Sequence, residues 1–299
     1  MHVLVTGGTG FIGRPLCAEL RQRGHRVSVL TRSAVRAAAR LGSDVRCIER
    51  LDALAGDPPE GCIHLAGENL GAGRWTPARK RAFVDSRVHT TRHLVDGLAR
   101  FAPRPRVLIS ASAIGWYGAR GDEPLTEEAP PGAQHEFTVQ LCQAWEDEAR
   151  RAEAHGLRVC RVRIGIVLER DGGSLARMWL PFRLGLGGPI GSGAQWMSWI
   201  HRADLVALLI WLLENPAAHG VYNGTAPEPV TNRTFTRALG RALHRPAWLP
   251  MPGFVLRLVL GEMADIVLTG QRVVPQRALE QGFVFRYPEL SAALAAIAG

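Results

Sequence analysis

The stretch Thr6-Gly-Gly-Thr-Gly-Phe-Ile-Gly13 decides the fold that this sequence predicts. It follows the apolar run Val3-Leu-Val5 and precedes a segment with helical character over residues 14–23. A strand, a glycine-rich turn and a helix in this order form the context in which such glycines bind a dinucleotide. We predict that Gly7 permits the tight turn, Gly10 lets the backbone approach a pyrophosphate, and Gly13 allows close packing of helix on strand.

The helix that follows these glycines predicts how phosphates are held. Its first turn offers unpaired N–H groups and the positive end of the helix dipole. We therefore assign Thr9, Phe11 and Ile12, which lie between the glycines, to the cofactor site as well. The spacing Gly-x-x-Gly-x-x-Gly differs from the Gly-x-Gly-x-x-Gly of most dehydrogenases. The alternative is an ordinary strand–helix turn.

The end of the next strand predicts which dinucleotide binds. Residues 26–30 alternate as a strand should, and Thr31, Arg32 and Ser33 follow. An NAD site would carry an Asp or Glu here for the ribose 2′-hydroxyl, whereas a guanidinium and hydroxyls suit a 2′-phosphate. No carboxylate follows the strand in sequence, so NADP (NADPH) is favoured over NAD. The alternative is that Arg32 is a surface arginine without a role in cofactor binding.

A strand over residues 61–67 ends in a second glycine turn. Because ligands lie at the carboxyl ends of parallel strands, Leu65, Ala66 and Gly67 are predicted to border the cofactor. His64, inside the strand, is interpreted as a packed core residue. Arg87, on the helical stretch 77–99, is predicted to reach a cofactor phosphate if its face turns inward, and solvent exposure is the alternative.

Composition restricts the class of protein. The chain has 299 residues, 46% of them hydrophobic, and a formal net charge of +9. Its arginines are spread along the chain without a basic block, which argues against nucleic acid as a partner. No apolar run is long enough to span a membrane, and no signal peptide precedes the first strand. Five scattered cysteines without a Cys-x-x-Cys pair indicate reduced thiols, a cytoplasmic location and no metal site.

Further segments carry a resemblance to a known superfamily. They are Ser110-Ala-Ser-Ala-Ile-Gly-Trp-Tyr-Gly118, Arg163-Ile-Gly-Ile-Val-Leu168 and Trp199-Ile-His-Arg-Ala-Asp204. With the glycine stretch, they resemble the extended short-chain dehydrogenase/reductase superfamily. From Thr225 onward the chain is similar to a narrower subgroup, the nucleoside-diphosphate-sugar epimerase-like proteins with an appended C-terminal segment. The resemblance covers essentially the whole chain.

The resemblance implies a catalytic serine and a Tyr-x-x-x-Lys unit, and the sequence departs from this pattern. Ser112 matches the serine. No Tyr-x-x-x-Lys can be written, because Lys80 is the only lysine and the tyrosines are at 117, 222 and 287. On the expected helix 136–153 the tyrosine position falls on Phe137 or Thr138, and the lysine position on Leu141 or Cys142. Neither alternative supplies a proton donor suited to neutral pH.

The catalytic candidates that remain are Ser112 and Tyr117, one turn further on. Other side chains that could carry a proton are Glu68, Glu146, His201 and Asp204. Each has a structural alternative: Tyr117 can pack at the wall of a cleft, Glu146 can bond within its helix, and His201 and Asp204 can position a loop and cap a helix.

The sequence therefore predicts an α/β fold, a Rossmann-type doubly wound parallel sheet with a small, mostly helical C-terminal subdomain. The expected boundaries are 1–225 for the NADP-binding domain, with a glycine-rich, loop-like insertion near 170–197 on the substrate side, and 226–299 for the subdomain. The predicted function is that of an epimerase- or oxidoreductase-like protein acting on a small polar metabolite such as a nucleotide sugar. The alternative is a non-catalytic NADP-binding sensor or regulatory protein. A homodimer is the candidate assembly.

Overall fold

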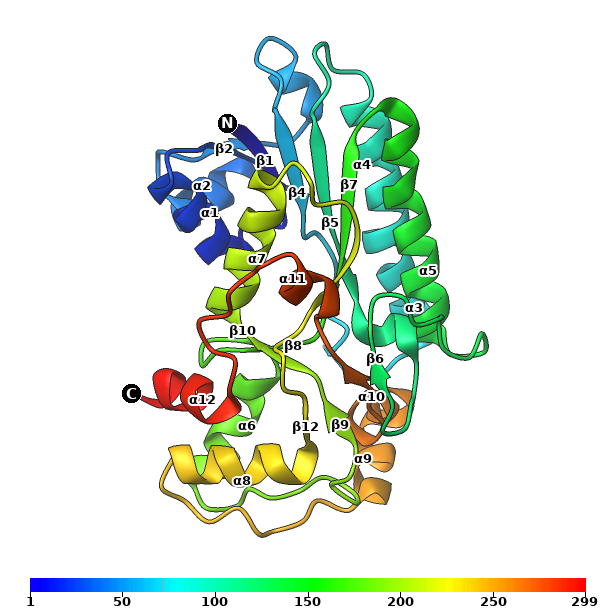
Figure 1. Cartoon of the computed structure of the whole chain (residues 1–299), viewed down its shortest axis with the longest axis vertical. Coiled ribbons are helices and arrows are strands. Elements are labelled where there is room, and N and C mark those ends of the chain that lie inside the picture. Colours follow the sequence, from blue (N-terminus) through cyan, green and yellow to red (C-terminus); the bar gives the residue numbers. More distant parts are fainter. Residues whose placement is uncertain (72) are drawn as a thin grey trace.

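A parallel seven-stranded sheet forms the central layer of the computed structural model, which describes residues 1–71 and 73–299 (Figure 1). The strand order is β11-β7-β5-β4-β1-β2-β3, so the chain starts in the interior of the sheet and winds outward in both directions. This confirms the predicted Rossmann-type fold. The strands are β1 His2–Thr6, β2 Arg26–Leu30, β3 Arg46–Ile48, β4 Gly61–His64, β5 Val107–Ala113, β7 Arg158–Ile164 and β11 Gly220–Gly224.

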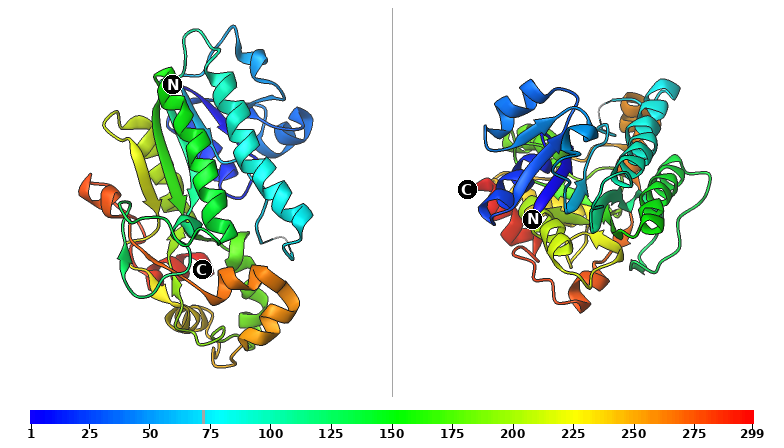
Figure 2. Two further views of the ribbon diagram at one scale, coloured as in Figure 1. Left: turned by 90° about the vertical axis from the view of Figure 1, so that its right-hand side faces the viewer. Right: turned by 90° about the horizontal axis from the view of Figure 1, so that it is seen from above.

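Alternation along the strands sends side chains into two separate cores. Val3 and Val5 of β1 belong to one buried cluster and Leu4 to another, because successive side chains of a strand point to opposite faces. The helices α1 Gly13–Gln22, α2 Ala34–Leu41 and α7 Arg202–Glu214 lie on the first face. The second face is covered by α3 Pro77–Val84, α4 Thr90–Leu98 and α5 Phe137–Arg150, and α4 and α5 run side by side there (Figure 2).

The predicted helical stretch 77–99 contains a local irregularity. Thr76 caps α3 by accepting a hydrogen bond from the Arg79 N–H at 3.2 Å, and Pro77 takes the first helical position. Between α3 and α4 the chain forms a π-helical turn, Asp85–His89. Such turns insert an extra residue into a helix and re-aim the side chains they carry. This one carries Ser86 and Arg87.

The insertion near 170–197 contains a helix where the sequence predicted a glycine-rich loop. Helix α6 spans Gly173–Arg183. The prediction gave too much weight to the glycines, which are concentrated after the helix, and too little to the spacing of Leu175, Trp179 and Phe182. These three side chains share one face and are buried.

The same insertion shares a hydrophobic core with the C-terminal tail. Trp179 and Trp199 pack in one cluster with Phe235 of α8 (Asn232–Ala242) and Leu294 of α12 (Leu290–Ala298). These elements form the lower half of the molecule in Figure 1. The unit predicted to lie on the substrate side is therefore built from two stretches of chain, and the boundary at residue 225 remains a prediction.

Shorter elements complete this unit and join it to the sheet. The strands are β6 Pro124–Leu125, β8 Ile166–Leu168, β9 Trp196–Met197, β10 Trp199–His201, β12 Val230–Thr231 and β13 Arg272–Val273. The helices are α9 Gly253–Leu260, α10 Asp265–Leu268 and α11 Gln276–Glu280, and 3₁₀ turns lie at Leu51–Leu54, Ile114–Tyr117, Arg151–His155 and Gly261–Ala264. Strand β13 pairs with β6, which ties the tail to the loop after β5.

Substituting Gly13 tests the close packing at the start of α1. A Cβ at this position would lie 2.2 Å from the carbonyl oxygen of Gly7, a backbone atom that cannot rotate away. We expect Gly13→Ala to lower the free energy of unfolding by about 1–3 kcal/mol in urea titrations. The control is Gly56→Ala, whose Cβ would meet nothing within 4 Å, and which should change stability by less than about 0.5 kcal/mol. Equal effects of the two substitutions would contradict the packing argument.

Candidate functional site

The glycine turn after β1 forms a cradle of backbone at the carboxyl edge of the sheet. Gly7 has φ of +71°, and a Cβ there would lie 2.7 Å from the Leu65 carbonyl oxygen. The Gly10 N–H donates to Gly7 O at 3.0 Å, which closes the turn, and α1 begins at Gly13. The exposed backbone of Gly10 and the helix N-terminus suit the pyrophosphate of a dinucleotide. The predicted residues Thr9 and Ile12 are half-buried within this turn.

A hollow of about 520 Å³ borders the turn, lined by Thr9, Gly10, Phe11, Arg14, Arg40 and Asp171. The ring of Phe11 lies against Gly172 and Gly173, where a Cβ would approach it to within 2.4 Å and 3.3 Å. Phe11 thus packs the cradle against the start of α6. Arg40 comes from α2 and adds a cation beside the glycines that sequence reasoning missed, because α2 and the turn meet only in the folded chain.

The end of β2 brings the predicted cofactor residues to the start of α2. Ser33 precedes that helix, Thr31 is half-buried, and Arg32 is exposed. A carboxylate does lie nearby, although none follows β2 in sequence. Glu49, just beyond the neighbouring strand β3, accepts a hydrogen bond from the Ala34 N–H at 2.8 Å. Its negative charge is paired with the N-terminus of α2, which supplies positive dipole there.

His64 links β1, β4 and α4 through one chain of hydrogen bonds. Its Nε2 is 2.9 Å from Thr91 Oγ1, and its Nδ1 is 2.6 Å from Thr6 Oγ1. Thr91 donates its hydroxyl proton to the Arg87 carbonyl at 2.6 Å, so it must accept from Nε2–H. Nδ1 is then the acceptor, and Thr6 donates to it while accepting from the Ala66 N–H at 3.2 Å. The buried imidazole is therefore neutral and structural, as predicted.

The π-helical turn places Arg87 against the second glycine turn. Arg87 is 8% exposed, donates to the Glu68 carbonyl at 2.7 Å and lies over the ring of Trp145 at 5.2 Å. A Cβ on Gly67 would be 3.2 Å from its guanidinium carbon. Ser86 accepts from the Glu68 N–H at 3.0 Å. The helix face that carries Arg87 thus turns inward. That Arg87 binds a cofactor phosphate remains a prediction.

Ser112 donates its hydroxyl proton to a buried ion pair. Its Oγ lies 2.7 Å from Glu146 Oε1, and Ser112 is 2% exposed. The Glu146 carboxylate is held by Arg163 through two bonds, of 2.8 Å from Nε and 3.1 Å from Nη2. Removing one partner of such a buried pair would leave an uncompensated charge, at a cost of about 3–5 kcal/mol. Glu146 is therefore interpreted as a structural anion behind Ser112.

Tyr117 lies in the continuation of this buried network. Its side chain is fully buried, its hydroxyl oxygen accepts from Arg163 Nη1 at 3.0 Å, and the hydroxyl donates to Asn223 Oδ1 at 2.7 Å. Burial raises the pKa of Tyr117 to about 12. These contacts correspond to the packing alternative and argue against a direct part in proton transfer.

A second cavity opens between the carboxyl edge of the sheet and the tail. Its volume is about 530 Å³, and it lies among β5, α5, β8, β9 and the segment 262–271. Its walls are mainly aromatic and aliphatic, with a few polar groups between them. The lining comprises Leu70, Trp75, Arg87, Ala113, Ile114, Gly115, Gly118, Ala119, His135, Glu136, Phe137, Thr138, Leu141, Cys142, Trp145, Gly165, Ile166, Trp196, Ser198, Glu262, Asp265, Ile266, Thr269 and Gln271.

Both alternatives for the missing Tyr-x-x-x-Lys unit face this cavity. Phe137, Thr138, Leu141 and Cys142 all contribute to its lining from the first turns of α5. Burial raises the pKa of the Cys142 thiol to about 12, so this side chain is a neutral thiol at physiological pH. Where the superfamily carries a phenol and an ammonium, this cavity therefore has a wall without a charged group.

The remaining proton carriers suggested by the sequence lie elsewhere. Asp204 accepts from the N–H groups of Arg286 and Tyr287 at 2.8 and 2.9 Å, and His201 caps α7 by accepting from the Ala203 N–H at 3.1 Å. Glu68 lies 3.9 Å from an Arg79 nitrogen. Sequence reasoning missed the acids that do line the cavity, Glu136, Glu262 and Asp265. Glu136 stands next to Phe137, and that adjacency was the one local signal.

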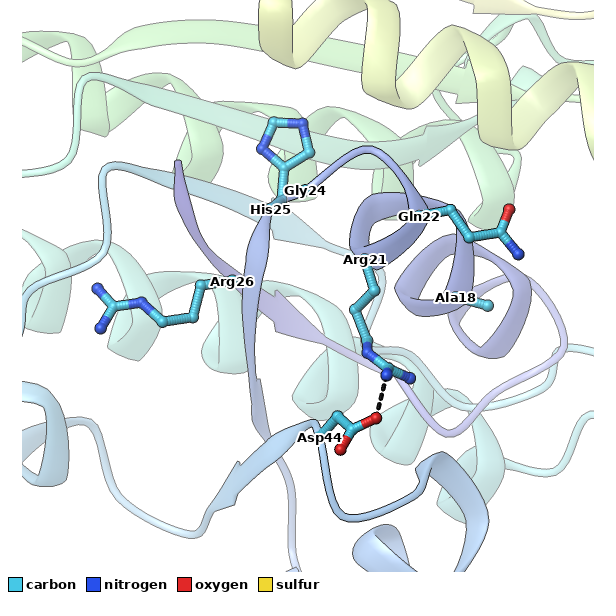
Figure 3. A pocket seen from close by; sticks show the side chains of 7 residues that line it. All are labelled: Ala18, Arg21, Gln22, Gly24, His25, Arg26 and Asp44. Carbon is cyan, nitrogen blue, oxygen red and sulfur yellow. Dashed lines mark hydrogen bonds and ion pairs between the residues drawn. The ribbon is translucent and has the colours of Figure 1, made fainter.

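Another hollow lies at the opposite end of β2, where this strand begins. It is lined by Ala18, Arg21, Gln22, Gly24, His25, Arg26 and Asp44 (Figure 3). Arg21 and Asp44 form an ion pair across it. Ligands of doubly wound sheets bind at the other edge, beyond the carboxyl ends of the strands. This hollow therefore does not enter the candidate site.

Residues 1–71 and 73–299 contain neither a cluster of metal ligands nor a helix suited to cross a membrane. These residues contain no group of three or more His, Cys, Asp or Glu side chains arranged to hold a metal ion. None of their helices combines the length and apolar character that crossing a membrane requires.

The sheet, the glycine cradle and the adjoining cavity define a Rossmann-type protein of the extended short-chain dehydrogenase/reductase class. The chain belongs to the NAD dependent epimerase/dehydratase family, whose model matches residues 3–223. A second model, a domain of unknown function (DUF1731), matches residues 251–297 in the tail. The predicted superfamily is confirmed.

Relatives of this chain are similar over nearly its whole length. The chloroplastic SDR39U1 homolog of Arabidopsis thaliana is 42% identical over 313 residues, 99% of this chain and 86% of the relative. The crystal structure of human epimerase family protein SDR39U1 (isoform 2) with NADPH has a TM-score of 0.88 at 37% identity, covering 100% and 99% of the two chains. A nucleoside-diphosphate sugar epimerase of Corynebacterium glutamicum has a TM-score of 0.80 at 31% identity, and 58% of its chain is covered.

The neutral state of His64 predicts a pH dependence of stability. Burial lowers its pKa from 6.5 to about 4. Between these values the unfolded chain binds a proton that the folded chain does not, so stability falls as pH falls from 6.5 toward 4, by about 3 kcal/mol in total. Unfolding measured across this range should show a flatter profile for His64→Gln, which keeps a donor and an acceptor. His93→Gln, an exposed imidazole on α4, is the control, and parallel profiles for wild type and His64→Gln would contradict the argument.

Proposed function

We propose that this chain binds NADPH at the glycine cradle and acts as an oxidoreductase on a small molecule held in the adjoining cavity. The observation that supports the proposal most directly is the position of the cavity along the carboxyl edge of the sheet. The glycine cradle lies at the same edge, where a Cβ on Gly7 or Gly13 would collide with backbone atoms. The human relative with NADPH supports the cofactor class. NADPH bound there would supply a hydride to an electrophilic carbon of the substrate.

NADP rather than NAD is proposed from the end of β2. Arg32 is exposed at the start of α2, with its charge available to a 2′-phosphate, and Arg40 lies beside the glycines. Glu49, the carboxylate nearby, is already engaged by a backbone N–H. The residues assigned to the cofactor from sequence, including Thr31, Ser33, Leu65 and Ala66, are part of this proposal.

For proton transfer we propose Glu136 in its protonated form, which would give its proton to the substrate oxygen and take another from solvent at its partly exposed side chain. A hydride added to a carbonyl carbon breaks the C=O π bond, and the oxygen then needs one proton. Glu136 lines the cavity directly before Phe137 and Thr138, the two positions that can match the tyrosine of the superfamily. Its carboxylate accepts from the Ala119 N–H at 3.1 Å, which fixes its direction. Ser112 is instead proposed to position Glu146 and the end of β5.

A non-catalytic NADP-binding protein is the second candidate. The observation that favours it is the wall formed by Phe137 and Leu141, neither of which can exchange a proton. A sensor would need the cradle and a docking site, without any proton carrier. The two candidates differ in whether the wild-type protein consumes NADPH.

Arg32→Glu tests the cofactor choice. We expect it to weaken NADPH binding about tenfold or more, because a carboxylate replaces the guanidinium that meets the 2′-phosphate, and to change NADH binding about twofold at most. Dissociation constants from calorimetric titration measure both. Arg100→Glu, an exposed arginine after α4, makes the same change in net charge and should affect neither cofactor. Equal effects of Arg32→Glu on both cofactors would overturn the NADP assignment.

Glu136→Gln tests the catalytic proposal. With NADPH and a panel of carbonyl compounds, wild type should consume NADPH. The variant should turn over at least about 10²-fold more slowly, because the proton carrier is lost. NADPH affinity should stay the same. The control is Glu228→Gln, an exposed glutamate outside the cavity lining. Tight NADPH binding without turnover by wild type would favour the non-catalytic candidate.

A further inference from the structure

The cavity of about 530 Å³ has aromatic walls that indicate which kind of substrate it binds. Trp75 and Phe137 meet edge to face with ring centroids 5.4 Å apart, and the buried Phe83 packs 5.8 Å from Trp75 behind them. Trp145 and Leu141 continue this surface along α5. Aromatic and aliphatic walls of this kind favour a flat apolar ligand over a heavily hydrated one.

The charged groups on the cavity lining are mostly acidic. Glu136, Glu262 and Asp265 contribute carboxylates, and the lining residues include one permanent cation, Arg87. Glu136 immediately precedes α5, and its carboxylate accepts from the Ala119 N–H at 3.1 Å. A phosphate placed here would meet negative charge where recognition of phosphate requires positive charge.

Three cations at or beside the cavity are each held by another group. Arg87 donates to the Glu68 carbonyl at 2.7 Å, Lys80 pairs with Glu262 at 2.6 Å, and Arg257 pairs with Asp265 at 3.2 Å. Lys80 also lies 5.0 Å from the ring centroid of Phe137. A pyrophosphate that recruited Lys80 or Arg257 would compete with Glu262 or Asp265 for the same cation.

We infer that the substrate part of this cavity takes a compact, uncharged, mainly apolar ring compound and excludes nucleoside diphosphates. The inference rests on the proposed function, since it concerns the substrate of that site. It departs from the polar metabolite or nucleotide sugar that the family resemblance implies. The cavity volume is consistent with a compact ligand, because about 530 Å³ lies in the lower half of the range for small-molecule sites. Any end of the cofactor that reaches the cavity reduces the volume left for the substrate.

Calorimetric titrations with two kinds of probe test this inference. The apolar probes are acetophenone and 2-acetylnaphthalene, and the phosphorylated probes are UDP and UDP-glucose. Each is titrated into the full chain, with and without NADPH. We expect the ketones to bind at least about tenfold more tightly than either uridine nucleotide, a difference of about 1.4 kcal/mol.

Variants connect this preference to the residues that cause it. Trp75→Ala should weaken ketone binding about tenfold, whereas Trp248→Ala, which removes an indole 72% exposed and outside the cavity lining, should not. The pair Glu262→Gln and Asp265→Asn should strengthen UDP binding severalfold relative to ketone binding, since it removes negative charge from the cavity lining.

The outcomes separate this inference from the proposed function. Tighter binding of UDP or UDP-glucose than of the ketones overturns the inference, and so does the absence of binding by every probe. Loss of NADPH binding alone contradicts the proposed function only, because the titrations of the free protein still report the preference between the two kinds of probe.

Discussion

The close approach of three backbones at the carboxyl edge of the sheet is the constraint on which the candidate site depends. Gly7 lies against the Leu65 carbonyl, and Gly13 lies against Gly7, at distances that leave no room for a Cβ. This contact sets β1, α1 and the end of β4 in one rigid arrangement. The Thr6–His64–Thr91 hydrogen bonds extend it to α4 and thereby fix the turn at Ala66. The cofactor cradle and the π-helical turn are both positioned by it.

A second buried arrangement explains why several reactive residues are not exposed to the cavity. Arg163 of β7 satisfies Glu146 of α5 and at the same time donates to the Tyr117 hydroxyl. Ser112 completes the set by donating to Glu146. A charge pair buried this deeply needs all of its hydrogen bonds to offset desolvation. These polar side chains are therefore engaged in holding the sheet edge, and the cavity wall formed by Phe137 and Leu141 carries no titratable group.

The cavity itself arises from two distant stretches of chain that share one core. Helix α6 packs with α8 and α12, and the segment 262–271 then reaches back to line the cavity. Lys80 pairs with Glu262 and Arg74 donates to the Leu258 carbonyl at 2.8 Å, so α3 and the loop before it contact the tail directly. The acids at the cavity come largely from this tail. Its chemistry thus depends on how the tail is placed over the sheet.

The sequence by itself determined the Rossmann-type sheet, the glycine turn and the absence of Tyr-x-x-x-Lys, because periodicity, turn glycines and residue identity are local properties. It placed β2 at its observed bounds, residues 26–30, but interpreted Gly173–Arg183 as loop. Only the tertiary structure decided which side chains are paired and which line the cavity. Glu49 accepts a hydrogen bond at the start of α2 and Glu146 pairs with Arg163, whereas Glu136 lines the cavity. Burial and pairing arise between residues far apart in the chain, so local sequence patterns do not predict them.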